Sequence, residues 1–252
     1  MSTLVTVITP TTGNPMLKDA LDGVAGQTYP NIQHLVVIDG EERAKAARRL
    51  ISKRSVDIIE LPYATGADGY LGHRIYGGTI YLAKGGLLCF LDEDNWMDEG
   101  HIESLVQVIE QGNQWAFSLR KIVDQKGEFV CPDNCESLGK WPSIIGGDDY
   151  MIDVNCFMLP KELALQLSPI WHRPCNEPFG IQADRALTAS LRESAPQFDC
   201  NYRYTLNYRA GSTDHSVKPD FFINGNRVMQ ERFGGELPWS PLARQPKRTH
   251  LD

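Results

Sequence analysis

The sequence predicts an α/β protein with a mostly parallel central sheet and helices on both of its faces. Strand-like and helix-like segments alternate through the first half of the chain, which is the pattern of repeated βα units. The run Leu87–Leu91 has the length and apolar character of a buried central strand. Residues 102–109 carry apolar side chains at i, i+3, i+4 and i+7, the spacing of an amphipathic helix.

Local composition predicts the elements of the first half. Leu4–Thr9 is rich in β-branched residues and His34–Asp39 is apolar and ends in an acid, so both are predicted strands. Glu41–Ile51 is rich in Ala, Arg and Lys, which favours a helix. The other expected elements are helices at Met16–Val24 and Gly72–Lys84 and strands at Val56–Leu61 and Leu87–Leu91.

The second half is less regular. Ala116–Val130 is predicted to form a hairpin whose turn is Asp124–Gly127. Residues 131–152 contain Pro, Gly and acids and predict a long loop, and such loops often bind ligands. Asp153–Leu159 is a further expected strand, and Pro160 is expected as the first residue of a helix. A last helix is outlined by Ile181, Leu187 and Leu191.

Composition excludes several classes of protein. The chain has 252 residues with 42% hydrophobic and 23% charged residues, which is ordinary for a globular protein. Its net charge of -7 argues against nucleic acid as a partner. Residues 1–7 lack the features of a signal peptide, and no run of about 18 apolar residues predicts a transmembrane segment. The six cysteines are scattered and are therefore expected to be reduced thiols.

Polar residues follow three of the predicted parallel strands, in Thr9–Pro15, at Asp39-Gly40 and in Asp92–Asp94. These strand ends share one edge of the sheet, where open α/β sheets bind ligands. An Asp-x-Asp pair there suits Mg²⁺ or Mn²⁺, although a solvated acidic turn before the helix near Glu99 is the alternative. The first strand is followed by neither a Gly-x-Gly-x-x-Gly nor a Walker-type loop, which argues against a dinucleotide oxidoreductase and a P-loop NTPase.

The ordered set of these segments resembles glycosyltransferase family 2, whose members have the Rossmann-like GT-A fold. The resemblance is good over roughly residues 3–110 and looser over 150–210. Gln27–Asn31 is similar to the "Q-T-Y-x-N" turn of that family. The other segments that carry the resemblance are Val5–Thr11, Leu21–Asn31, Leu35–Gly40, Ala83–Gly85 and Phe90–Asp94.

The resemblance implies a single GT-A domain over residues 1–252, with a nucleotide-sugar-binding half at 1–115 and an acceptor-binding half with the C-terminal tail at 116–252. Many relatives carry an Arg-Asn pair where this chain has Tyr76-Gly77, so Arg74 is expected to take over a phosphate or sugar contact, or to be a plain surface residue. The implied nucleotide-binding residues are Thr9, Pro10, Thr11, Asp39, Arg74, Asp92 and Glu93. The implied ligands of Mn²⁺ or Mg²⁺ are Asp92, Asp94 and His215.

The resemblance also implies a catalytic base in the second half, at Asp184. Asp184 shares the apolar face of its helix with Ile181 and Leu187, which is unusual for an acid unless it is paired or functional. An ion pair is the alternative, and Asp148, Asp149 and Asp153 stay open as other candidates for the base. The residues expected at the donor or acceptor sugar are Asp153, Asn155 and Trp171, the last with a core position as its alternative.

We therefore expect a metal-dependent, inverting glycosyltransferase that moves a sugar from a nucleotide-diphosphate donor to a hydroxyl acceptor. UDP is the favoured carrier from the frequency of UDP donors in the family, with GDP and dTDP open. The acceptor is expected to be a saccharide or lipid-linked, in a cytoplasmic enzyme of polysaccharide or glycan synthesis, with peripheral membrane association and homo-oligomers left open. A catalytically silent sugar-nucleotide-binding protein and a nucleotidyltransferase are the two alternatives.

Overall fold

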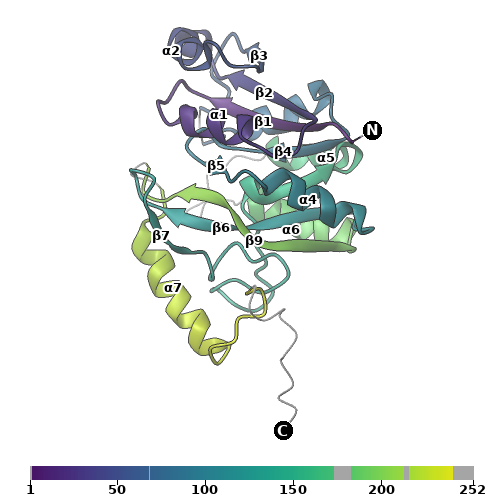
Figure 1. The fold of residues 1–252 in the computed structure, drawn as a ribbon, viewed down its shortest axis with the longest axis vertical. Coiled ribbons are helices and arrows are strands. Elements are labelled where there is room, and N and C mark those ends of the chain that lie inside the picture. The colour runs from purple at the N-terminus through teal and green to yellow at the C-terminus, as the bar shows by residue number, and fades with distance from the viewer. Residues whose placement is uncertain (1, 68, 173–182, 213–215, 241–252) are drawn as a thin grey trace.

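The computed structural model describes residues 2–67, 69–172, 183–212 and 216–240 (Figure 1). Its elements alternate as the sequence predicts in the first half and become irregular in the second. The first-half elements are β1 (Val5–Thr11), α1 (Leu17–Ala25), β2 (Ile32–Ile38), α2 (Glu41–Ile51), β3 (Asp57–Glu60), α3 (His73–Thr79), the 3₁₀ turn η1 (Ile80–Leu82), β4 (Leu87–Phe90), β5 (Trp96–Met97) and α4 (His101–Glu110).

The second half adds strands to the same sheet and a helix beyond it. Its elements are β6 (Trp115–Val123), β7 (Phe129–Pro132), the 3₁₀ turn η2 (Val154–Cys156), β8 (Phe157–Pro160), α5 (Lys161–Leu167), the 3₁₀ turn η3 (Ser168–His172), α6 (Ala183–Ser194), β9 (Phe198–Arg209) and α7 (Pro219–Arg232).

One sheet runs through both halves of the described chain, in the order β3-β2-β1-β4-β8-β6-β9-β5, with β7 on β6. Strands β1, β2, β3, β4, β6 and β9 point in one direction, and β5, β7 and β8 run against them. The chain moves outward from β1 through β2 to β3 and then returns to place β4 on the other side of β1. The carboxyl ends of β1 and β4 therefore flank a topological switch point, where α/β proteins bind ligands.

Helices cover both faces of the sheet, as expected. Residues of β2 alternate between the faces: Val36 and Ile38 join the main core with α1 and α2, whereas Leu35 and Val37 pack against Ile75 of α3. Helix α4 packs on β6 and β9, and α5 packs on β4 and β8 (Figure 1). The predicted mixed α/β fold with a mostly parallel sheet is thus confirmed.

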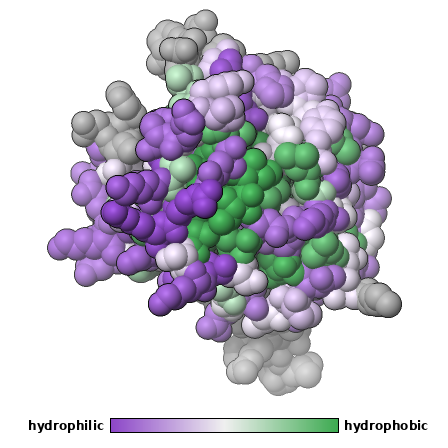
Figure 2. Space-filling view, turned by 90° about the horizontal axis from the view of Figure 1, so that it is seen from above, coloured by the Kyte–Doolittle hydropathy of each residue, from purple (hydrophilic) through white to green (hydrophobic). Residues whose placement is uncertain are grey.

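The face that holds α2 and β3 is partly apolar. Figure 2 views this end of the molecule and shows apolar side chains gathered at its centre among polar ones. Strand β3 is an edge strand here, and its Ile58 is 45% exposed.

Helix α3 is shorter than the predicted helix Gly72–Lys84. It ends at Thr79 and continues only as the 3₁₀ turn η1. Two adjacent glycines weaken the helix at this point. A Cβ at Gly77 would lie 2.9 Å from the Cβ of Trp171, so the missing side chain lets α3 approach η3 closely.

The hairpin of β6 and β7 forms as predicted, with Gly127 at φ +87° in its turn. Pro160 ends β8 and is the N-cap of α5. It was expected as the first residue of the helix, a position that Lys161 occupies. Strand β9 and helix α7 were not among the sequence predictions. Among the described residues, no helix is both long and apolar enough to cross a membrane.

Candidate active site

The end of β1 presents main chain to the ligand-binding edge, because its side chains are engaged inside the protein. Thr9 is buried, and its Oγ1 lies 2.9 Å from Nε2 of His34 on β2. Pro10 is also buried, and Thr11 Oγ1 donates a hydrogen bond to Glu93 at 2.6 Å. A nucleotide at this edge would thus meet the backbone of the β1 loop in preference to the side chains of Thr9 and Thr11.

Glu93 closes the β1 loop from the other side of the switch point. Its carboxylate accepts hydrogen bonds from the hydroxyls of Thr11 and Thr12, both at 2.6 Å. It also accepts from the backbone N–H groups of Thr12 and Asn14 at 3.1 Å. Through these hydrogen bonds Glu93 joins the end of β4 to the end of β1, and we call this set of contacts the latch. Direct contact with a nucleotide stays a prediction.

Asp39 lies directly after β2 and organises the loop that follows β3. One carboxylate oxygen accepts from the N–H and hydroxyl of Thr65, at 2.6 and 2.9 Å, and the other accepts from the N–H of Gly66 at 3.1 Å. Arg74 reaches the same loop, where Nη1 lies 3.4 Å from the carbonyl of Thr65 and the guanidinium stacks on the Tyr70 ring. Asp39 and Arg74 therefore meet at one loop beside the β1 edge.

Asp92 is held on both carboxylate oxygens. Oδ1 accepts a hydrogen bond from the Tyr76 hydroxyl at 2.7 Å, and Oδ2 accepts from the Asn155 amide at 2.8 Å. Burial, followed by repulsion from Asp94 and Asp153, raises the pKa of Asp92 to about 7. Tyr76 thus helps to hold this carboxylate in place.

Asp94 follows at the edge of the same loop, and Arg209 fixes its backbone. Arg209 Nε donates to the Asp94 carbonyl at 3.0 Å, Nη1 donates to the Gln125 carbonyl, and Nη2 pairs with Asp19 at 2.5 Å. Burial raises the pKa of Asp94, while a hydrogen bond with Ser212 and the charge of Arg209 oppose that rise.

Trp171 lies behind Tyr76 and is not exposed toward a ligand. It is 1% exposed, and its ring packs against those of Tyr76, Phe90 and His73 at centroid distances of 5.5–5.6 Å. Trp171 therefore occupies a core position, which was the alternative to contact with a sugar. Its contact with the site runs through Tyr76, whose ring it supports.

Asn155 and Asp153 extend the network into the second half of the chain. Asn155 is buried, and its side-chain oxygen accepts from the Asp92 N–H at 2.5 Å while its amide also donates to Asp153 Oδ1 at 2.7 Å. Asp153 forms an ion pair with Arg120. Asn155 and Asp153, two of the three residues predicted at the sugar, are thus part of the support beneath Asp92.

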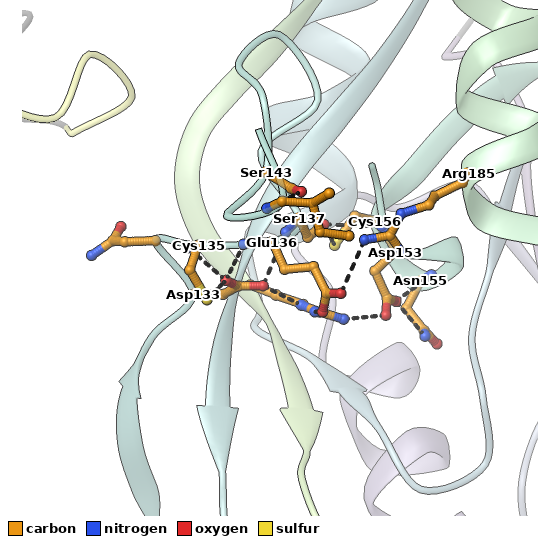
Figure 3. Close-up of polar contacts among 12 residues, drawn as sticks. Asp133, Cys135, Glu136, Ser137, Ser143, Asp153, Asn155, Cys156 and Arg185 are labelled. Atoms are coloured by element: carbon orange, nitrogen blue, oxygen red, sulfur yellow. Dashed lines mark hydrogen bonds and ion pairs between the residues drawn. The ribbon is translucent and has the colours of Figure 1, made fainter. Parts of the chain in front are cut away.

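Arg120 is the centre of this support. It is 1% exposed and pairs with Asp133 at 2.7 Å, with Glu136 at 3.1 Å and with Asp153, while its guanidinium lies over the Tyr208 ring. Figure 3 shows that the side chains of Asp133 and Glu136, from one segment, and of Asp153, from another, lie close together. A buried guanidinium with three carboxylates fixes the positions of the segments that carry them.

Asp184 is in the first turn of α6, where its Oδ1 is buried and has no hydrogen-bond partner among the described residues. Burial, with repulsion from Asp153 and Asp92, raises the pKa of Asp184 well above the ordinary value. The ion-pair alternative is not seen in this part of the chain. The structure therefore brings an unsatisfied carboxyl group into electrostatic range of Asp92.

The other candidate bases have different surroundings. Asp148 is exposed, and Asp149 pairs with Arg185 at 2.7 Å and with the Ser143 hydroxyl. Asp153 is committed to Arg120 and Asn155. His215, the third predicted metal ligand, lies outside the described residues.

The carboxylates at the β4 end fit a divalent cation. Asp92 and Asp94 are hard oxygen donors, and their mutual repulsion is the electrostatic condition that a cation relieves. Among the described residues, no three His, Cys, Asp or Glu side chains form a metal cluster on their own. Mg²⁺ commonly takes one or two protein carboxylates and completes its shell with substrate phosphates.

Several contributing residues were not predicted from the sequence. Arg120, Glu136, Arg185 and Arg209 were given no role, although Arg120 stands in the apolar run of β6, where an unpaired charge would be costly. An arginine within an apolar strand is the feature of the sequence that could have indicated a buried ion-pair network.

Comparison with known structures defines the class of protein first. The TarS 1-349 structures of S. aureus match with TM-scores of 0.59 in the complex with UDP and 0.62 in the complex with UDP-GlcNAc, each at 16% identity over 90% of this chain. The mannosyltransferase PcManGT of Pyrobaculum calidifontis, in complex with GDP-Man and Mn²⁺, has a TM-score of 0.52, 16% identity and 79% coverage. The chain spans 64%, 66% and 55% of these three chains. The fold is that of the GT-A glycosyltransferases.

The family follows from a second comparison. The model of glycosyl transferase family 2 matches residues 6–134, just over half of the chain. The protein therefore belongs to glycosyl transferase family 2. No curated protein sequence gives a significant match.

Proposed function

We propose that this glycosyltransferase is a metal-dependent, inverting enzyme that transfers a sugar from a nucleoside-diphosphate sugar to a hydroxyl acceptor. The observation that carries the proposal is Asp184, whose Oδ1 is buried without a hydrogen-bond partner in the described chain and whose carboxyl group feels the charges of Asp153 and Asp92. An unpaired acid in that position suits a general base at the edge where the fold binds its ligand.

In the proposed reaction, the acceptor hydroxyl gives its proton to Asp184 as its oxygen bonds to the anomeric carbon. The bond from that carbon to the diphosphate oxygen breaks, and its electron pair leaves with the nucleoside diphosphate. A single displacement of this kind inverts the anomeric centre. Asp184 can accept the proton only when it is deprotonated, which its raised pKa makes dependent on pH.

The donor would lie along the β1 and β4 ends. The β1 loop over Thr9–Thr11, together with Asp39 and Arg74, would position the nucleotide. Asp92 and Asp94 would hold Mn²⁺ or Mg²⁺, which supplies positive charge near the departing diphosphate. The presence of Mn²⁺ with GDP-Man in the PcManGT structure supports this assignment.

We favour a UDP-sugar as donor, supported by the UDP and UDP-GlcNAc complexes of TarS. A saccharide or lipid-linked acceptor, a cytoplasmic and membrane-peripheral location, and a role in glycan or polysaccharide synthesis stay predictions. The division into a nucleotide half at 1–115 and an acceptor half at 116–252 is part of the same proposal. It is supported by the placement of Asp39 and Asp92 in the first and Asp184 in the second.

Calorimetric titration of UDP, GDP and dTDP, with Mn²⁺ and then with chelator, tests the donor site. We expect one nucleotide to bind in the presence of metal and to lose affinity when the metal is chelated. No binding of any nucleotide in either condition would contradict the donor site. Binding without release of nucleoside diphosphate from a bound donor, in wild type and Asp184→Asn alike, would favour the silent sugar-nucleotide-binding protein.

A further inference from the structure

We propose that Arg185 is a positioning residue that sets the orientation of Asp184 by tying the first turn of α6 to the loop of residues 133–153. This inference rests on the proposed role of Asp184 as the base. It concerns how the protein aims a carboxyl group that has no hydrogen-bond partner of its own in the described chain.

The first tie is a two-carboxylate clamp on Arg185. Its Nε donates to Asp149 Oδ1 at 2.7 Å, and its Nη2 lies 3.3 Å from both Asp149 Oδ2 and Glu136 Oε1. Figure 3 shows Arg185 directed toward Glu136 from the neighbouring helix. The planar guanidinium can satisfy both acids at once, so it fixes the direction as well as the distance of the helix start.

The second tie comes one turn later, on Thr188. This buried hydroxyl donates to the Asp184 carbonyl at 2.7 Å and accepts from the Ile152 N–H at 3.1 Å. The main chain of the loop is thus hydrogen-bonded to the same helical turn that carries the base. Together with Arg185, this contact leaves the first turn little freedom to rotate.

The loop that receives both ties continues directly to the metal carboxylates. Asp149 holds Arg185, Ile152 holds Thr188, and three residues later Asn155 binds Asp92 through both its amide and its carbonyl oxygen. Residues 149–155 therefore act as a spacer between the helix of the base and the strand end of Asp92. The spacer is itself anchored to Arg120 through Asp153.

Asp184 depends on such contacts of its helix for its orientation, because its own Oδ1 has no hydrogen-bond partner in the described chain. Neighbouring residues on a helix differ by about 100° around its axis, so Arg185 can bind the loop while Asp184 faces the site. A rotation or tilt of this turn would move the Asp184 oxygens relative to the acceptor. Misplacement of a reacting group by about 1 Å can cost about 100-fold in rate.

Arg192 provides a matched control on the same helix. It lies seven residues after Arg185, on the same face and about 10 Å farther along the axis. It contacts the same loop, through the Gly139 carbonyl at 3.0 Å and the Tyr150 ring at 3.7 Å. Arg192→Ala therefore removes an arginine tie to the loop without touching the turn that holds Asp184.

The experiment compares Arg185→Ala, Arg185→Lys and Arg192→Ala in the full chain, by release of nucleoside diphosphate from the donor that binds in calorimetry. We expect Arg185→Ala to lower kcat by about 10–100-fold with the donor KM nearly unchanged. Arg185→Lys should recover part of kcat, because lysine keeps the charge but cannot bind two carboxylates in a fixed fork. Arg192→Ala should stay within about twofold of wild type.

Hydrogen exchange of the peptide 183–190 gives a readout that does not depend on turnover. It should be faster in Arg185→Ala than in Arg192→Ala at equal overall stability. Equal kcat and equal exchange in the two alanine variants would overturn the positioning role. Full activity of Asp184→Asn would instead overturn the proposed base, whereas an inactive Asp184→Asn with unaffected Arg185→Ala would overturn only this inference.

Discussion

The two sides of the candidate site hold their carboxylates in different ways. On the donor side, Asp39 and Glu93 accept hydrogen bonds mainly from backbone N–H groups and threonine hydroxyls of nearby loops. On the proposed acceptor side, Asp133 and Asp153 also accept backbone N–H groups, but both pair with the charge of one buried guanidinium, Arg120. Most contacts on the first side come from neutral groups, with Arg43 as a more distant charge at 3.6 Å from Asp39, whereas the second side is centred on the single buried charge of Arg120.

This difference predicts how each side responds to substitution. A hydrogen bond from a neutral donor to a carboxylate contributes about 1.5–3 kcal/mol, whereas breaking a buried ion pair leaves an uncompensated charge and costs about 3–5 kcal/mol. Single changes on the proposed donor side should therefore alter ligand binding more than stability. Changes to the acceptor network should alter stability and rate together.

The largest effect is expected from Asp94→Ala. Loss of a proposed direct metal ligand should weaken metal-dependent nucleotide binding by more than the ~10–100-fold that outer-shell substitutions cost, and should abolish transfer. Calorimetry with Mn²⁺ measures the binding, and circular dichroism checks the fold. Glu99→Ala, which removes an exposed acid five residues later, serves as the control. Unchanged metal-dependent binding in Asp94→Ala would show that this carboxylate is not a ligand.

The second effect is the pH dependence that Asp184 imposes. Burial, Asp153, Asp92 and Glu136 raise its pKa, and Arg120 opposes them, so the proton is held to higher pH than in a free aspartate. A base must be deprotonated, so kcat should fall as pH decreases through this raised pKa. Asp184→Asn should lower kcat by about 10²–10⁴-fold and remove that limb of the profile.

Asp148→Asn is the control for this profile, because Asp148 is an exposed acid in the loop of residues 133–153. It should retain the wild-type pH dependence. A wild-type rate that stays constant through the acidic range would contradict a raised pKa for the base.

A third effect separates stability from chemistry. Arg120→Met should lower the free energy of unfolding by about 3–5 kcal/mol, because Asp133 and Asp153 would stay buried without their cation. Urea denaturation measures this loss. The matched change Arg203→Met, on the exposed surface of β9, should cost less than about 0.5 kcal/mol. Equal stability of the two variants would mean that the network is not held by Arg120.

The smallest effect is expected from Tyr76→Phe on the donor side. The change removes one of the two side-chain hydrogen bonds to the Asp92 carboxylate and leaves that of Asn155. We expect a loss of about 1 kcal/mol, which corresponds to about a fivefold increase in the donor KM. Tyr81→Phe, at a residue that is 64% exposed, should leave KM unchanged. A similar KM for both variants would remove Tyr76 from the support of the site.

The sequence predicted which residues lie at the proposed donor edge better than it predicted the contacts among them. Asp39 and Asp92 could be placed because the carboxyl ends of parallel strands meet at one edge. The resemblance indicated Asp184, and its helical spacing to Leu187 was a second sign. The latch of Glu93 on Thr12 joins residues 81 positions apart, and no periodic pattern encodes such a contact. Trp171 illustrates a further limit, since composition does not decide whether an indole faces the ligand or the core.

The second half was harder to predict because its strands lack a clear pattern. Strand β9 mixes buried and half-exposed positions without regular alternation, so the apolar signal that identified β4 is missing. The buried position of Arg120 depends on three carboxylates that follow it by 13, 16 and 33 positions in the chain. Only the folded chain brings them together, and the sequence gives no local sign of their pairing.

The latch formed by Glu93 has a consequence for how the donor edge meets its ligand. The loop from Thr11 to Asn14 is fastened across the switch point by contacts within the protein itself. Binding of the proposed nucleotide sugar should therefore not need to order this main chain, so that little conformational entropy is lost there on association. Selection among donors at this edge would then depend on how well each donor fits a loop that is already ordered.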